Sequence, residues 1–321
     1  MVVALPAPSL GAVPTNWSAQ PVTLLTAALL VTAYIAGVRR LARSGRGWPI
    51  GRTLTFALGI ALYLWTTCGF LEVYRRALFW VWVTQTLLLF LVVPLVVLAG
   101  GPLHLARACW GADGWPDRVL RTRPARVLAN PLVGPALVPL LSGVLFFGPL
   151  PRWAIETSIA GWGLQLALVL IGALIALPLA GVEEARSSLA VGLSLAIGMF
   201  ELVLDALPGA VLRLHTTPAT SFFNARATYA WTPSALHDQQ TAGSIVWVLA
   251  EIIDLPFLLL VFHRWLRVDA RDAAEVDAIL EAERIARLGA RADDLEAGHG
   301  PTEAPWWLTD PSMQRRFGRE D

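Results

Sequence analysis

Long apolar segments alternate along this sequence with short segments that contain arginine. A helix needs about 20 apolar residues to cross a bilayer, and seven runs come close to that length. They are Val22–Val38, Leu54–Leu71, Ala77–Leu98, Pro131–Leu150, Ile159–Leu179, Leu189–Pro208 and Gly243–Val261. The pattern predicts an all-α integral membrane protein with seven transmembrane helices.

Arginines between the runs predict how the chain is oriented. The loops after the first and third runs and the segment after the seventh are rich in arginine. These residues are Arg39, Arg40, Arg43, Arg46 and Arg52, then Arg107, Arg118, Arg121, Arg123 and Arg126, then Arg264, Arg267 and Arg271. Because basic loops stay in the cytoplasm, we expect the N-terminus outside and the C-terminus in the cytoplasm. The expected parts are an extracytoplasmic segment (1–21), a seven-helix domain (22–263) and a cytoplasmic tail (264–321).

Composition agrees with a membrane protein and excludes other classes. Of 321 residues, 55% are hydrophobic and 15% are charged, whereas a soluble domain has about 25% charged residues. The net charge of +1 argues against a nucleic-acid partner. Two cysteines cannot form a disulfide framework. No nucleophile elbow, phosphate loop or zinc-protease motif occurs, so we expect no enzymatic activity.

The tail has a charged helical segment and a tryptophan pair. From about Val268 to Leu295 the sequence predicts a helix with Val276, Ile279 and Leu280 on one face. Trp306 and Trp307 follow among Gly and Pro residues. Two interpretations stay open: the indoles lie in the lipid headgroup region, or the segment docks on a partner protein.

Four carboxylic acids lie within the last two predicted spans. Glu201 and Asp205 are one turn apart, and Glu251 and Asp254 are three residues apart, so each pair shares a helix face. Ionisable groups inside a membrane are costly and are therefore candidates for function. If the two helices pack side by side, the four groups would line one cavity that opens to the outside. A metal site, a proton path and a structural polar network are all compatible with this pattern.

A smaller polar group occurs in the third span. Trp82, Gln85 and Thr86 lie three and four residues apart and would share one helix face. The spacing alone does not indicate what this cluster in an apolar helix is for.

Residues that can bind a soft metal are few. Cys68, Met199 and His237, together with Glu201 and Asp205, are the candidates for a copper site. No two of them form a compact ligand motif. A lone thiol in a membrane helix is usually a small core residue, and a loop histidine is usually solvated.

One motif at the start of the seventh span is specific enough to indicate a family. In "DQQTAGSIVW", Asp238, Gln239, Gly243 and Trp247 follow the pattern D-Q-x-x-x-G-x-x-x-W. With "LAGGP" at Leu98–Pro102 and "NPL" at Asn130–Leu132, the chain resembles the CtaG family of caa3-type cytochrome c oxidase assembly factors. The similarity runs from about Arg52 to Asp272. The resemblance implies an outward-facing pocket between spans three, five, six and seven. Its expected lining is Trp82, Gln85, Thr86, Asp238 and Gln239 together with the four carboxylic acids.

The sequence departs from that family at its histidines. The resemblance implies an H-M-x-Q-H pattern in the third span that handles copper on the outer side. Aligned on Gln85, this chain has Trp82 and Thr86 where the two histidines would be. A further histidine pair is implied near the start of the fifth span, where this chain has Trp162 and Gln165.

Three hypotheses follow for a protein of the bacterial plasma membrane. The first is copper delivery to an oxidase through displaced ligands. The second is a metal-free scaffold that contacts oxidase subunits or other assembly factors. The third is a proton or ion carrier that uses the four carboxylic acids, although no inverted repeat supports it.

Overall fold

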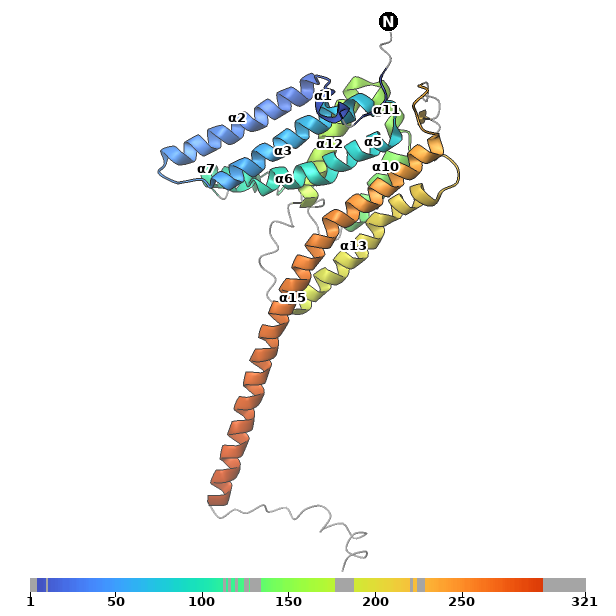
Figure 1. Ribbon diagram of the computed structural model, residues 1–321. Helices are drawn as coiled ribbons and strands as arrows, with labels where there is room; N and C mark the ends of the chain where they lie inside the picture. The colour runs from blue at the N-terminus through green and yellow to red at the C-terminus, as the bar shows by residue number, and fades with distance from the viewer. Residues whose placement is uncertain are drawn as a thin grey trace, which may run out of the picture. The chain divides into compact units, whose positions relative to one another are not determined.

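The protein is helical throughout the part of the chain that its structure describes. The computed structural model describes residues 5–9, 11–111, 114, 117–118, 121–123, 127, 134–176, 188–219, 222–223 and 229–296. Every regular element in these ranges is a helix (Figure 1). The predicted all-α class is therefore confirmed.

The helices follow the predicted apolar runs and the segments between them. In chain order they are α1 (Ala12–Thr15), α2 (Pro21–Arg43), α3 (Ile50–Cys68), α4 (Phe70–Tyr74), α5 (Phe79–Leu87), the π-helix η1 (Leu88–Val92), α6 (Val93–Ala99), α7 (Pro102–Trp110), α10 (Gly134–Phe147), α11 (Leu150–Glu156), α12 (Ser158–Ala176), α13 (Ser188–Leu214) and α15 (Ala235–Glu296).

Four helical segments are long and apolar enough to cross a membrane. They are Pro21–Arg43, Ile50–Tyr74, Phe79–Ala99 and Ser158–Ala176. They coincide with the first, second, third and fifth predicted spans. The remaining three predicted spans overlap α10, α13 and α15. The seven-span topology and the orientation of the termini stay predictions.

Glycines set how closely the central helices approach one another. A Cβ at Gly59 would lie 2.7 Å from Cγ2 of Val97, and a Cβ at Gly100 would lie 2.6 Å from Cβ of Phe56. These contacts join α3 to α6, which lie side by side in Figure 1. Apolar helices in lipid gain little from hydrophobic burial, so close backbone packing of this kind is what holds them together.

The third span contains a π-helical turn that the sequence analysis did not predict. Pro94 has no N–H group and cannot bond to the carbonyl of Phe90 four residues earlier. The π-helix η1 lies directly before this proline. Gly172 of α12 lies against the freed carbonyl, because a Cβ there would overlap the Phe90 oxygen. The proline and the glycine together let α12 cross η1 and α6 in backbone contact.

A second glycine pair joins α13 to the first part of α15. A Cβ at Gly243 would lie 2.6 Å from the backbone nitrogen of Arg213, and one at Gly209 would lie 2.8 Å from that of Trp247. Gly243 and Trp247 belong to the motif that indicated a family. The glycine in that motif therefore has a packing role, since no side chain fits between the two backbones.

The chain forms two compact units, one of residues 1–185 and 190–262 and the other of residues 186–189 and 263–321. The predicted seventh span and the predicted tail helix belong to one continuous helix, α15. In the smaller unit, the expected apolar face is exposed to solvent: Val276, Ile279 and Leu280 are each more than half exposed. Trp306 and Trp307 lie outside the described residues.

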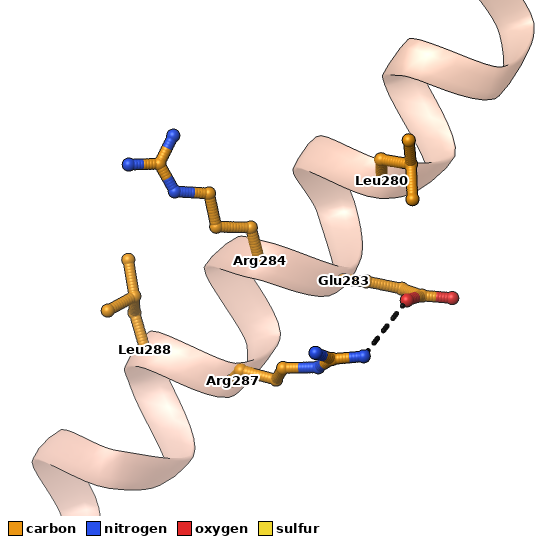
Figure 2. A pocket seen from close by; sticks show the side chains of 5 residues that line it. All are labelled: Leu280, Glu283, Arg284, Arg287 and Leu288. Carbon is orange, nitrogen blue, oxygen red and sulfur yellow. Dashed lines mark hydrogen bonds and ion pairs between the residues drawn. The ribbon is translucent and has the colours of Figure 1, made fainter.

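A shallow hollow on the tail part of α15 does not form an enclosed site. Its lining residues are Leu280, Glu283, Arg284, Arg287 and Leu288. Figure 2 shows that all five project from a single helix, with Arg287 Nη2 3.4 Å from Glu283 Oε2. No second element covers these side chains within the described residues, so this is surface relief on a charged helix.

Candidate functional site

A buried carboxylate gathers four nitrogen donors where α4 meets α5 and α12. Glu72 is only 5% exposed. Its Oε1 lies 2.9 Å from Arg75 Nη2 and accepts a 3.3 Å hydrogen bond from Gln20 Nε2. Its Oε2 accepts hydrogen bonds of 2.9 Å from Gln85 Nε2 and 3.0 Å from Gln165 Nε2. We call these five residues the Glu72 cluster.

A break in the second span places Glu72 in this cluster. Gly69 ends α3 in an extended conformation, and a Cβ there would lie 2.5 Å from the Trp65 carbonyl oxygen. The short helix α4 starts immediately afterwards and carries Glu72 and, at its C-terminal end, Arg75. The chain therefore turns the carboxylate toward the neighbouring helices instead of continuing α3 straight.

Further hydrogen bonds fix the glutamines of the cluster. Gln85 Nε2 also donates to the Thr66 carbonyl at 2.9 Å. Trp162 Nε1 donates to Gln20 Oε1 at 2.9 Å, which orients the Gln20 amide so that its nitrogen faces Glu72. The cluster joins the segment before α2 to α3, α4, α5 and α12.

The cluster is an ion pair embedded in amide donors. Arg75 is 4% exposed and supplies the positive charge. Its Nε is buried without a hydrogen-bond partner among the described residues. Both carboxylate oxygens of Glu72 accept two donors each, so their lone pairs are committed to the protein. Such a group is poorly suited to bind a metal or to act as a base, and well suited to fix the relative positions of helices.

Asp238 caps the N-terminus of a different helix. Its Oδ2 accepts a 2.8 Å hydrogen bond from the backbone N–H of Phe79, and its Oδ1 accepts a 2.9 Å bond from that of Trp80. These are the first two N–H groups of α5, which have no partner within the helix. Burial raises the pKa of Asp238, although both hydrogen bonds and His237 oppose that shift.

Gln239 is hydrogen-bonded to the end of α13 and to the segment that follows it. Its Oε1 accepts a 2.5 Å hydrogen bond from the Ala219 N–H. Its Nε2 donates to the carbonyls of Leu212 at 3.2 Å and Thr217 at 3.3 Å. The Asp-Gln pair of the sequence motif thus joins the start of α15 to α5 on one side and to α13 on the other.

Of the residues predicted in the third span, Gln85 belongs to the Glu72 cluster and the other two do not. Trp82 is 1% exposed, and its indole N–H lies 3.5 Å from the Leu145 carbonyl oxygen. Thr86 is buried and donates to the carbonyls of its own helix, at 2.8 Å for Val83. Within the described residues, both contribute to packing.

The four predicted carboxylic acids are only partly described. Asp205 is buried in α13. Glu251 is half-buried and accepts a hydrogen bond from the indole of Trp247, one turn earlier in α15. The side chains of Glu201 and Asp254 lie outside the described part of the structure, so the predicted shared cavity stays a prediction.

The remaining copper candidates are dispersed. Cys68 is buried at the end of α3, Met199 is 52% exposed on α13, and His237 is exposed beside Asp238. Among the described residues, no three His, Cys, Asp or Glu side chains come together as a metal-binding group. The surroundings of Gln85 do not fit copper either, since Gln85 is bonded to the Thr66 carbonyl and the Glu72 carboxylate, and both Glu72 oxygens already accept two donors each.

The N-terminal segment, residues 5–9 and 11–20, crosses the end of the bundle that holds the Glu72 cluster. We call it the N-terminal strap. Tyr74 donates its hydroxyl to the Pro6 carbonyl at 3.1 Å and accepts a 3.2 Å hydrogen bond from Asn16 Nδ2. Trp231 Nε1 donates to the Leu5 carbonyl at 2.9 Å. The strap ends at Gln20, a member of the cluster.

Sequence reasoning missed Glu72, Arg75 and Gln20. The signal for Glu72 was present, because it is the first acidic residue of the chain and follows an apolar run directly. An arginine three residues later on a helix is a further sign of a pair. Gln20 gave no such signal, since a glutamine before a predicted span is an ordinary polar residue.

Replacing Asp238 tests its capping role. Asp238→Ala would leave two buried N–H groups of α5 unpaired, and we expect a loss of about 2–4 kcal/mol in the free energy of unfolding. Because the pKa of Asp238 is raised, the folded state binds its proton more tightly than the unfolded state. Wild-type stability therefore falls as pH rises through the folded pKa.

Unfolding in detergent at acidic and neutral pH measures both effects. The alanine variant lacks the titrating group. The difference in unfolding free energy between the wild type and Asp238→Ala should therefore be largest at acidic pH and become smaller toward neutral pH. Asp269→Ala removes an exposed carboxylate from the tail helix and serves as the control. A difference that grows with pH would contradict the assigned direction.

Four helical segments that could cross a membrane, a buried ion pair among amide donors and the Asp238 cap together define a helical-bundle protein of membranes with a structural polar cluster. Residues 32–268 match the model of the family described as cytochrome c oxidase caa3 assembly factor (Caa3_CtaG). The match covers well over half of the chain, which therefore belongs to this family.

Similar proteins occur in mycobacteria. Uncharacterized protein Mb0105 of Mycobacterium bovis and uncharacterized protein MT0111 of Mycobacterium tuberculosis are each 24% identical over 306 residues, which is 90% of this chain and 44% of each relative. Uncharacterized protein ML1998 of Mycobacterium leprae is 24% identical over 279 residues, covering 82% of this chain and 41% of the relative. The chain thus spans less than half the length of these relatives. No solved structure matches it.

Proposed function

We propose that this protein supports the biogenesis of a cytochrome c oxidase as a metal-free scaffold in the bacterial plasma membrane. Membership in a family of assembly factors supports the oxidase part of the proposal and suggests a non-catalytic role that involves contact with oxidase components. Four helices that are apolar and long enough to span a bilayer support the membrane location.

The Glu72 cluster carries the metal-free part of the proposal. By resemblance, Gln85 stands in the family pattern between two histidines that handle copper. In this chain the Gln85 amide is bonded to Thr66 and Glu72. Trp82 and Thr86 stand where the two histidines would be. Neither an indole nor a threonine hydroxyl can bind copper as an imidazole or a thiolate does. The one residue of that pattern that this chain keeps is thus bonded to a buried ion pair that fixes helices.

Copper delivery is the alternative that an experiment must separate from this proposal. Deleting the gene should lower the amount of assembled oxidase, which haem absorbance and oxidase activity both report, and the wild-type gene should restore it. In parallel, the purified protein in detergent should compete for Cu(I) with a chromophoric chelator. Oxidase loss without copper binding supports the scaffold.

Two other results would change the conclusion. One tightly bound copper per chain would reject the metal-free role and favour delivery through Cys68, Met199, Glu201, Asp205 or His237. An unchanged oxidase level after deletion would reject the assembly role itself. If carboxylate-dependent ion flux then appeared in liposomes, the carrier hypothesis would take its place.

A further inference from the structure

One end of the larger unit is covered by arginines without acidic partners. The five arginines of the α2–α3 region are Arg39, Arg40, Arg43, Arg46 and Arg52, and all are exposed. No acidic residue occurs in the sequence before Glu72. None of the five pairs with a carboxylate among the described residues. These exposed charges are therefore available to an anion from outside this part of the chain.

The short helix α7 is packed onto the same end. Leu105 is 2% exposed and faces Gly37 of α2, where a Cβ would lie 3.0 Å from Leu105 Cδ2. The Cys109 thiol donates to the Gly37 carbonyl at 3.3 Å. The region after the third span is thus held against the region after the first, as expected if both lie on one side of the membrane.

Three of the arginines are fixed by contacts that leave donors free. The Arg40 guanidinium lies 5.6 Å from the ring centre of Trp110, and that of Arg52 lies 5.2 Å from the ring centre of Trp48. A guanidinium stacked on an indole uses its face and keeps the N–H groups of its edge available. Arg46 Nη2 donates one hydrogen bond to the Ala108 carbonyl at 2.6 Å, and its other N–H groups stay available.

The two indoles indicate where this surface lies. Trp110 is 46% exposed, and the Trp48 indole N–H is bonded to the Tyr34 hydroxyl at 2.9 Å. Tryptophan prefers the boundary between hydrocarbon and headgroups. Arginines at that depth meet the phosphate groups of lipids, which accept the paired N–H donors of a guanidinium.

Some other arginines of the chain lie beside carboxylates. Arg107 of α7 is bonded to Asp117 at 2.7 Å, and Arg287 of the tail helix lies 3.4 Å from Glu283. These arginines are neutralised by neighbouring carboxylates, as is usual on a solvated surface. Arg40, Arg46 and Arg52 instead contact Trp110, the Ala108 carbonyl and Trp48.

We propose that Arg40, Arg46 and Arg52, presented by the α2–α3 region beside α7, bind the phosphate of an anionic membrane phospholipid. The site differs from the Glu72 cluster and does not depend on the proposed role in oxidase assembly. Basic groups next to a membrane span contribute to attraction by anionic lipids, and the sequence predicts this end of the bundle to be cytoplasmic.

Lipid titration of the full-length protein in detergent tests the site. Native mass spectrometry would follow binding of phosphatidylglycerol and of phosphatidylcholine, which has the same phosphate but no net charge. We expect the wild type to bind phosphatidylglycerol at least about tenfold more tightly, and we expect added salt to weaken that preference. Arg40→Gln, Arg46→Gln and Arg52→Gln together should lower phosphatidylglycerol affinity roughly a hundredfold.

A matched triple variant controls for charge. Arg271→Gln, Arg284→Gln and Arg287→Gln remove three exposed arginines from the tail helix and should leave lipid binding unchanged. An equal loss in this control, or equal wild-type affinity for both lipids, would overturn the proposal. Displacement of phosphatidylglycerol by the same concentration of inorganic phosphate would overturn it in favour of a free anion. If the first triple variant does not fold, the wild-type lipid preference and its salt dependence decide the question alone.

Discussion

Glu72→Ala is expected to lower the free energy of unfolding by about 3–5 kcal/mol, because removing one partner of a buried ion pair leaves the other charge uncompensated. The substitution would leave the charge of Arg75, which is only 4% exposed, without a partner. It would also remove the acceptor that the amides of Gln20, Gln85 and Gln165 share. The loss should appear as a large decrease in the midpoint of thermal unfolding in detergent. Oxidase assembly in cells should fall with it if the scaffold must be rigid.

The pair formed by Arg152 and Glu156 provides the control for Glu72. These residues are 3.2 Å apart and well exposed on α11. Because exposed ion pairs contribute little, Glu156→Ala should change the unfolding midpoint only slightly. Equal effects of the two substitutions would show that the Glu72 cluster is not a buried structural pair.

A double substitution separates the ion pair from the amides. If Glu72→Ala destabilises the protein because it leaves Arg75 buried without a counter-charge, then Glu72→Ala combined with Arg75→Met should be less destabilising than the sum of the two single changes. The three glutamine amides would still lack their acceptor, so we expect only partial recovery. Full additivity would mean that the two charges do not interact across 2.9 Å.

Gly172→Ala should lower the free energy of unfolding by nearly as much as Glu72→Ala. The added Cβ would overlap the Phe90 carbonyl oxygen and would lie 2.8 Å from Pro94 Cγ. Backbone cannot move aside as a flexible side chain does, so α12 would have to separate from η1 and α6. We expect a loss of about 3 kcal/mol, as for severe overpacking of a core, measured as the midpoint of thermal unfolding in detergent.

Gly163 offers a matched control on the same helix. It is exposed, and no atom lies within 4 Å of the position that its Cβ would take. Gly163→Ala should be neutral or stabilising by up to about 1 kcal/mol, because alanine favours helix more than glycine does. If both substitutions were tolerated equally, the close approach of α12 to the third span would not exist.

The apolar runs predicted the all-α class and the four helical segments that are long and apolar enough to cross a membrane, because bilayer thickness and helix rise constrain both the length and the composition of a span. The π-helix in the third span was not predicted. Its cause, Pro94, was visible, but the compensating Gly172 lies in another helix. Which glycine meets a freed carbonyl depends on packing, and packing is not encoded in any single window of sequence.

Of the five residues in the Glu72 cluster, only Gln85 was predicted as a site residue. Gln85 could be identified because it is a polar residue within an apolar run. Glu72 lies at the end of such a run and resembles an ordinary boundary residue. Asp238 and Gln239 were identified by a motif, but the motif does not show that Asp238 caps a helix 159 residues earlier in the chain. Contacts between distant segments become apparent only when the helices are assembled.

The N-terminal strap has a consequence for synthesis. Leu5 is bonded to Trp231 across 226 residues, and the cap on α5 comes from Asp238. A chain that emerges from the ribosome N-terminus first can make neither contact until Trp231 and Asp238 have been translated. Closing such long loops is slow because entropy opposes it before any contact forms. The helices that precede Trp231 are therefore synthesised before the contacts that complete this end of the bundle can form.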